Sequence, residues 1–167
     1  KKTDMHYDKK GKIAKQGNID KKIIDKLLNI HPYKKSYDIK DFNLVLLKKL
    51  SLKDGAATLI EYTAISLIGS ILNFLEDAQW HKTINIFLCG GGRKNNFLVS
   101  RINNKIITKK INRPVQLIDN LGIDGDFVES QAFGYLAIRT FLKLPISFPE
   151  TTGCKKPSEG GVIIKNF

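Results

Sequence analysis

Three consecutive glycines, Gly90, Gly91 and Gly92, lie between a segment that alternates like a β-strand and a segment spaced like a helix, within residues 83–96. Because glycine has no Cβ, the backbone there can turn tightly and a flat or charged ligand can approach it. The free N–H groups and partial positive charge at the start of a helix would face the same gap. The pattern indicates a nucleotide site. A sharp strand-to-helix turn with no ligand is the alternative interpretation.

Two more specific nucleotide motifs are absent from the chain. A P-loop needs GxxxxGK followed by Ser or Thr, and no such string occurs. A dinucleotide fingerprint needs GxGxxG, but Asn95 occupies the third required position when the motif starts at Gly90. A glycine turn without its own lysine is better suited to the sugar and base of a nucleotide than to its phosphates.

A second candidate for chemistry is the carboxylate of Glu129, which follows the acidic loop containing Asp124 and Asp126. At a loop–helix junction such a side chain can accept hydrogen bonds from ligand hydroxyls. The spacing of Asp126 and Glu129 equally predicts a capping box, in which the two side chains bond to each other's backbone N–H groups. The two roles are compatible if only one carboxylate oxygen caps the helix.

The elements that would position these residues follow from apolar periodicity, caps and turn residues. In chain order we expect a strand–turn–strand over residues 5–17, a helix capped by Asn18 or Asp20 and ended by Pro32, a helix from about residue 41, a core helix capped by Asp54 and reaching residue 75, a strand ending at residue 89, a helix carrying Phe97, Leu98 and Ile102, a strand over residues 114–118, a loop over residues 119–126, a helix over about residues 127–142 and a last strand over residues 161–164. This alternation predicts an α/β protein with a parallel sheet segment, and residues 1–167 as a single domain.

The charge balance raises the possibility of a polyanion partner. The 167-residue chain has 28 basic and 16 acidic residues and a formal net charge of +12. Its arginines are few and its lysines are scattered in pairs with little aromatic interleaving, which favours a solvated lysine surface over a nucleic-acid footprint. A basic module that binds nucleic acid or another polyanion remains the alternative function, and a degenerate domain without a ligand is a third.

Other sequence features bear on the compartment, metal binding and membrane association of the protein. The chain opens without the apolar segment of a signal peptide, and its two cysteines have no metal or disulfide spacing, so a reducing cytoplasm is the expected compartment. The histidines are far apart and suggest no zinc site. The longest apolar helix is interrupted by Glu61, Ser66 and Ser70, so we expect a core helix and no membrane span, with Glu61 and Tyr62 in structural roles.

Several strings occur in a characteristic order: YDKKGKIAKQG (7–17), PYKKSYDIKDF (32–42), DGAATLIEYTA (54–64), CGGGRKN (89–95), DNLGIDGDFVESQAFGYLA (119–137) and PETTGCKKP (149–157). Together they resemble the anhydro-N-acetylmuramic acid kinases, a family of the actin-like ATPase superfamily. The resemblance extends over nearly the whole chain but over only the second half of a full-length kinase.

This resemblance implies a ribonuclease H-like (actin-like ATPase) lobe, an α/β fold with a mixed sheet and flanking helices. The implied reaction transfers the γ-phosphoryl group of ATP, with Mg²⁺, to the 6-oxygen of 1,6-anhydro-N-acetylmuramic acid while water opens the anhydro ring, giving N-acetylmuramic acid 6-phosphate in cell-wall recycling. The implied partners are that amino sugar, the N-terminal lobe of the same kinase and a second copy in a homodimer. By similarity, Gly90, Gly91, Gly92 and Asn95 line the adenosine pocket and Glu129 contacts the amino sugar.

The chain also departs from the family pattern. Arg93 and Lys94 stand where the family usually has Ala-His, Ser130 follows Glu129 where alanine is usual, and Gly134 replaces a common alanine. The family's first phosphate loop and its general-base aspartate have no counterpart. Phosphoryl transfer depends on positioning and charge stabilisation around metal-bound phosphates, so we expect no kinase activity from this chain alone and assign it no catalytic or metal-binding residue.

Overall fold

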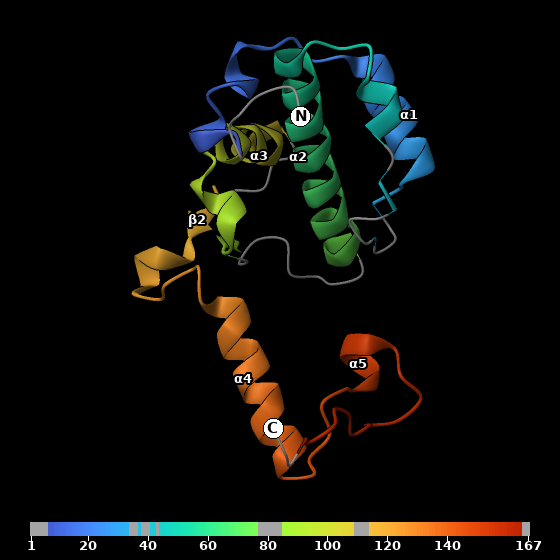
Figure 1. Cartoon of the computed structure of the whole chain (residues 1–167), viewed down its shortest axis with the longest axis vertical. Helices are drawn as coiled ribbons and strands as arrows, with labels where there is room; N and C mark the ends of the chain where they lie inside the picture. Colours follow the sequence, from blue (N-terminus) through green and yellow to red (C-terminus); the bar gives the residue numbers. More distant parts are fainter. Residues whose placement is uncertain are drawn as a thin grey trace.

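The computed structural model describes residues 7–33, 37, 41–42, 44–76, 85–108 and 114–164. Their fold is mixed α/β, with helices, short 3₁₀ turns and a small parallel sheet (Figure 1). The helices and strands are α1 (Lys21–Ile30), α2 (Leu52–Glu76), β1 (Phe87–Leu88), α3 (Asn96–Thr108), β2 (Gln116–Leu117), α4 (Val128–Phe141) and α5 (Pro149–Thr152). The α/β class predicted from the sequence is therefore confirmed.

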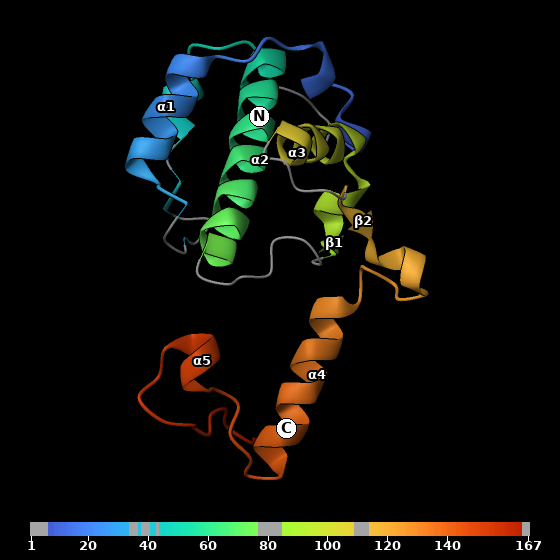
Figure 2. The same ribbon diagram turned by 180° about the vertical axis from the view of Figure 1, so that it is seen from behind.

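The core is built on α2, which lies between α1 and α3 (Figures 1 and 2). On one side, buried α2 side chains pack with those of α3 and the segment before β2; the cluster is Ala64, Ile68, Ile102, Ile106 and Val115. On the other side, Tyr62 of α2 packs with Ile24 and Leu27 of α1. The periodic apolar positions predicted this burial, because helical residues three and four apart share a face.

The starts of α1 and α2 follow capping chemistry, with one difference from prediction. The Asp20 carboxylate accepts the Ile23 N–H at 3.1 Å, as expected for the cap of α1. For α2, however, the Ser51 hydroxyl oxygen accepts the Asp54 N–H at 3.1 Å, so Ser51 takes the capping position predicted for Asp54. The Asp54 carboxylate instead accepts the Asn18 N–H at 2.6 Å, which ties the segment before α1 to the start of α2.

Helix α2 is longer and more apolar than the sequence pattern suggested. An 18-residue window within its Leu52–Asn73 stretch has a mean hydropathy of 1.5, and the stretch is long enough to cross a bilayer. It is nevertheless a core helix, because α1 and α3 pack on it and buried Glu61 forms ion pairs with Arg101 Nε and Lys105 Nζ of α3, both at 2.5 Å. The structural role predicted for Glu61 is confirmed.

Strands β1 and β2 pair in parallel, with Phe87 opposite Gln116 and Leu88 opposite Leu117. The parallel pairing was predicted, but each strand has only two residues. Ile86 and Leu88, which share one face of the segment because they are two residues apart, both pack against the α2–α3 core. Residues 83 and 84 of the predicted strand lie outside the described residues.

The prediction of a strand–turn–strand near the N-terminus is wrong for residues 7–17. This segment forms two 3₁₀ turns, Lys9–Gly11 and Ala14–Gln16. The cause is the Asp8 carboxylate, which accepts the N–H groups of both Ile13 and Ala14 at 2.9 and 3.0 Å and so folds the chain locally. Residues 5 and 6 lie outside the described part.

Two further elements differ from prediction. The helix expected from residue 41 is only a 3₁₀ turn, Leu44–Leu47, which ends before α2 begins. The last strand expected over residues 161–164 has no regular secondary structure. Instead, Ser147 and Ser158 form an isolated antiparallel bridge that closes the loop carrying α5.

Helix α4 matches the predicted range but extends away from the α1–α3 helices (Figures 1 and 2). None of its residues is buried, and Phe133, Ile138 and Phe141 are 64%, 60% and 71% exposed. The segment after it folds back, with Arg139 Nε donating to the Pro145 carbonyl at 2.6 Å. An apolar helix in this state has a face without a partner in the described chain.

Candidate nucleotide site

The glycine turn is open on one side. Gly90 has φ 74°, a left-handed value that favours glycine, and an added Cβ at Gly90 or Gly91 would meet no atom within 4 Å. The chain continues through the 3₁₀ turn Gly91–Lys94 before α3 starts at Asn96, so the regular helix begins later than its position directly after the glycines would suggest. Space for a ligand therefore exists beside this turn.

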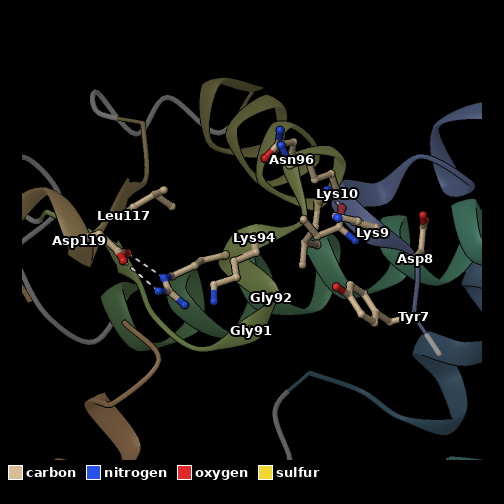
Figure 3. A pocket seen from close by; sticks show the side chains of 13 residues that line it. Tyr7, Asp8, Lys9, Lys10, Gly91, Gly92, Lys94, Asn96, Leu117 and Asp119 are labelled. Atoms are coloured by element: carbon tan, nitrogen blue, oxygen red, sulfur yellow. Dashed lines mark hydrogen bonds and ion pairs between the residues drawn. The ribbon is translucent and has the colours of Figure 1, made fainter. Parts of the chain in front are cut away.

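That space is a cavity of about 710 Å³. Figure 3 shows it between the glycine turn and the N-terminal segment. Its described lining consists of Tyr7, Asp8, Lys9, Lys10, Gly91, Gly92, Arg93, Lys94, Asn95, Asn96, Leu98, Leu117 and Asp119. The sequence-predicted residues Gly91, Gly92 and Asn95 are thus brought together, whereas Gly90 and Glu129 lie outside this lining.

Asn95 has a second role at this cavity. Its Oδ1 accepts the Leu98 N–H at 3.0 Å and so caps the first turn of α3. This capping bond holds the side chain at the junction of the glycine turn and the helix. The amide nitrogen of Asn95 can therefore donate to a ligand without disturbing the cap.

Sequence reasoning missed the contribution of residues 7–10. The Asp8 turn described above carries Tyr7, Lys9 and Lys10 to the cavity wall opposite the glycines, where Figure 3 places them near Lys94. Lys10 has φ 60°, a sparsely populated conformation for a residue with a Cβ. The YDKKG string was the available signal, but a turn of this kind looks like any surface loop until its neighbour in space is known.

Arg93 is buried beneath the glycine turn, with a side chain only 4% exposed. Its guanidinium donates to Asp119 through Nε and Nη2 at 2.7 and 2.9 Å, and through Nη1 to Asp126 at 2.5 Å and the Gly90 carbonyl at 3.0 Å. Figure 3 marks the pair at Asp119. Hydrogen bonds from Arg93 hold the pKa of Asp119 and that of Asp126 well below their ordinary range.

The capping box predicted from Asp126 and Glu129 is wrong. Phe127 is the residue before α4, and no side chain caps the helix there. The Asp126 carboxylate bonds instead to Arg93 and Lys94, since these cations attract it more strongly than neutral backbone N–H groups do. Glu129 lies in the first turn of α4 with an exposed side chain, so its carboxylate is accessible from solvent.

Within the part of the chain that the structure describes, no group of three or more His, Cys, Asp or Glu side chains could hold a metal ion. Asp119, Asp124 and Asp126, three carboxylates of the segment before α4, are all paired with Arg93. His6 and His81 lie outside the described residues. Cys89 and Cys154 are both free thiols.

Comparison with known proteins gives the family. The family model for anhydro-N-acetylmuramic acid kinase matches residues 1–166. The chain belongs to this family. Curated anhydro-N-acetylmuramic acid kinases similar to it include those of Pelagibacter ubique (47% identical over 99% of the chain), Zymomonas mobilis (36% over 97%) and Caulobacter vibrioides (35% over 95%).

The chain spans less than half the length of these anhydro-N-acetylmuramic acid kinases: 44%, 43% and 41%, respectively. Family membership favours the kinase interpretation of the glycine turn over the alternative of a polyanion-binding module. It also accounts for the order of the strings from YDKKG to PETTG, which local pattern alone does not explain.

Proposed function

We propose that the chain is the C-terminal part of an ATP-dependent kinase acting on 1,6-anhydro-N-acetylmuramic acid. The kinase would phosphorylate the 6-oxygen and open the anhydro ring, giving N-acetylmuramic acid 6-phosphate for cell-wall recycling in the cytoplasm. The observation that carries the proposal is the open cavity of about 710 Å³ beside a glycine turn in a chain of this family.

In this proposal Gly91, Gly92 and Asn95 form the wall for adenosine, and Gly90, which lies outside the lining, makes the turn that precedes them. The missing Cβ atoms let the flat base and ribose lie close to the backbone. Leu98 and Leu117 add apolar lining to the same cavity. The residues present therefore suit the nucleoside half of ATP.

Two lysines at the cavity suit the anionic half of ATP. Lys9 and Lys10 belong to its lining, and ammonium groups attract phosphate oxygens, whereas Lys94 of the same lining is paired with Asp126. Bound Mg²⁺ would neutralise charge on those phosphates, yet the described residues contain no cluster to hold it. The metal ligands and the general base are therefore assigned to the remainder of the full-length enzyme.

Glu129 is proposed to accept hydrogen bonds from hydroxyl groups of the amino sugar. Its side chain is exposed in the first turn of α4, and the failure of the capping box leaves it available for this role. Glu129 is three residues after Asp126, which bonds to Arg93 next to the glycine turn.

The partner proposed for this chain is the N-terminal lobe of the same kinase. Relatives are more than twice as long, and here the sheet has two residues per strand while α4 exposes apolar side chains. Phe127, Ile138 and Phe141 recur at spacings that place them along one side of the helix. We propose that this stripe packs against the missing polypeptide and completes a ribonuclease H-like lobe, so that residues 1–167 act as one domain of a two-lobe enzyme.

The test combines binding and complementation. Isothermal titration of the chain with Mg-ATP should give saturable binding, whereas binding of heparin only, with a steep salt dependence, would support the polyanion alternative. The chain alone should show no phosphoryl transfer to anhydro-N-acetylmuramic acid. Adding the first half of the Pelagibacter relative should restore turnover, and a mixture that still shows no turnover would contradict the proposal. Size-exclusion chromatography separates this complex from a homodimer of the chain.

A further inference from the structure

The guanidinium of Arg93 joins two segments that the proposed function places on different ligands. Arg93 belongs to the turn that follows Gly90, and its two strongest acceptors come from the loop before α4, 26 and 33 residues later in the chain. The Asp119 pair is a two-pronged contact, with Nε and Nη2 each bonded to a different carboxylate oxygen at 2.7 and 2.9 Å. Such a fork fixes orientation as well as distance.

The backbone on both sides fits closely around this side chain. A Cβ on Gly125 would lie 2.4 Å from Arg93 Nε, so only glycine leaves room for the guanidinium at this position. The Gly90 N–H donates to the Gly125 carbonyl at 2.8 Å, and Arg93 Nη1 donates to the Gly90 carbonyl at 3.0 Å. Arg93 therefore bonds to the Gly90 carbonyl and to the acidic loop, while the Gly90 N–H bonds to that loop directly.

These contacts connect the glycine wall of the cavity, through Arg93, to the start of α4. Gly91 and Gly92 form the cavity wall directly before Arg93. Asp126 is bonded to both Arg93 and Lys94, and α4 with Glu129 begins immediately after it. No side-chain cap holds the start of α4, and this ion cluster, together with the Gly90 N–H bond to the Gly125 carbonyl, ties the segment before α4 to the glycine turn.

We propose that Arg93 is a positioning residue that fixes the distance and orientation between the glycine turn and the start of α4, where Glu129 lies. The inference rests on the proposed function, which places the nucleotide at the glycine turn and the amino sugar at Glu129. Arg93 lines the cavity, but its side chain is only 4% exposed and its guanidinium is bonded to Asp119 and Asp126. Its role explains why the chain has arginine and lysine before Asn95: both cations are used by the acidic loop.

The test uses Arg93→Lys, because lysine keeps the charge but cannot form the two-pronged contact. Arg101→Lys is the matched control, since Arg101 Nε also bonds a carboxylate, that of Glu61, at 2.5 Å but joins α2 to α3 instead. Hydrogen exchange is followed by mass spectrometry on the ligand-free chain. We expect Arg93→Lys to speed exchange roughly tenfold in residues 90–92 and also in residues 124–129. Arg101→Lys should leave both segments unchanged.

Faster exchange in only one of the two segments, or equal effects of Arg93→Lys and Arg101→Lys, would overturn the positioning role proposed for Arg93. Asp126→Asn, at a side chain that is 41% exposed, is the second variant if Arg93→Lys fails to fold, and it should speed exchange in the same two segments. Titration with Mg-ATP is run in parallel, and Arg93→Lys should weaken binding roughly tenfold while Arg101→Lys does not. A wild-type chain that fails to bind ATP would count against the proposed nucleotide site, whereas the exchange result would still decide the role of Arg93.

Discussion

Gly11 lies directly against the side chain of Asn95. A Cβ on Gly11 would be 2.3 Å from Asn95 Oδ1 and 2.6 Å from Phe97 Cβ, and the residue has φ 73°. The N-terminal turn and the start of α3 therefore meet at a point where only glycine fits. This contact places the wall formed by residues 7–10 opposite the glycine turn, so it defines the width of the cavity.

Gly11→Ala should destabilise the chain by at least about 1–2 kcal/mol, because alanine is strained at this φ and its Cβ would displace the cap of α3. Urea unfolding followed by circular dichroism measures the change. Gly134→Ala is the control, since a Cβ at Gly134 meets nothing within 4 Å and alanine favours the interior of α4 by about 0.5–1 kcal/mol. Equal midpoints for Gly11→Ala and wild type would refute the close contact.

Gly91→Val should lower the affinity for Mg-ATP while leaving the fold intact. There is room for the added side chain, because no atom lies within 4 Å of the Cβ position, but the valine would project into space proposed for the nucleoside. Titration calorimetry gives the affinity and circular dichroism the fold. Gly134→Val, a change of the same kind on α4, should bind ATP as wild type does. Undiminished affinity in Gly91→Val would defeat the assignment of the adenosine wall.

Glu61→Gln should destabilise the chain by roughly 2–3 kcal/mol, because Arg101 and Lys105 lose their anionic partner but keep some contact with water. Burial raises the pKa of Glu61, and hydrogen bonds from Arg101 and Lys105 outweigh it, so the net pKa is below its ordinary value. A lowered pKa contributes stability above the unfolded value of about 4.3, and this contribution is lost as the pH falls through the folded value. The difference between wild type and Glu61→Gln should therefore shrink below about pH 4 in urea titrations. A constant difference down to pH 2 would contradict this charge assignment.

Ile138→Asp should leave the stability of the isolated chain nearly unchanged, since Ile138 is 60% exposed. It should abolish complementation by the first half of the Pelagibacter relative, because a carboxylate would have to be buried in the proposed apolar contact. Turnover of the mixture and thermal unfolding of the chain are the two measurements. Ala132→Asp, exposed on another side of α4, is the control and should still complement. Equal complementation by both variants would rule out the stripe as the contact surface.

The helices were predictable from the sequence because local chemistry determines them. The apolar spacing of α1, α2 and α3 and the Asp20 cap depend on residues within a few turns of one another. The parallel pairing of β1 and β2 also followed from the alternation of helix and strand. The failures came where a distant or competing partner decides the outcome. Asp8 bonds to its own loop, which prevents the strand expected there, and Asp126 bonds to Arg93 instead of capping α4.

The candidate site was predictable only in part for the same reason. The glycine turn was visible as a pattern, and its open side is found in the structure. The opposite wall comes from Tyr7 to Lys10, which no sequence rule joins to residues more than eighty positions later. Burial of Arg93 was equally invisible, because a basic residue next to glycines looks like a phosphate ligand until its carboxylate partners are known.

The pairing of Glu61 with Arg101 also bears on how the protein is made. Forty residues separate the two, so a ribosome finishes the most apolar helix of the chain well before it synthesises the cation that neutralises Glu61. During that interval Leu52–Asn73 emerges as an apolar stretch long enough to cross a bilayer. We expect nascent chains to be held by a chaperone until α3 arrives, and ribosome-bound intermediates truncated before residue 96 to be the species most prone to aggregate.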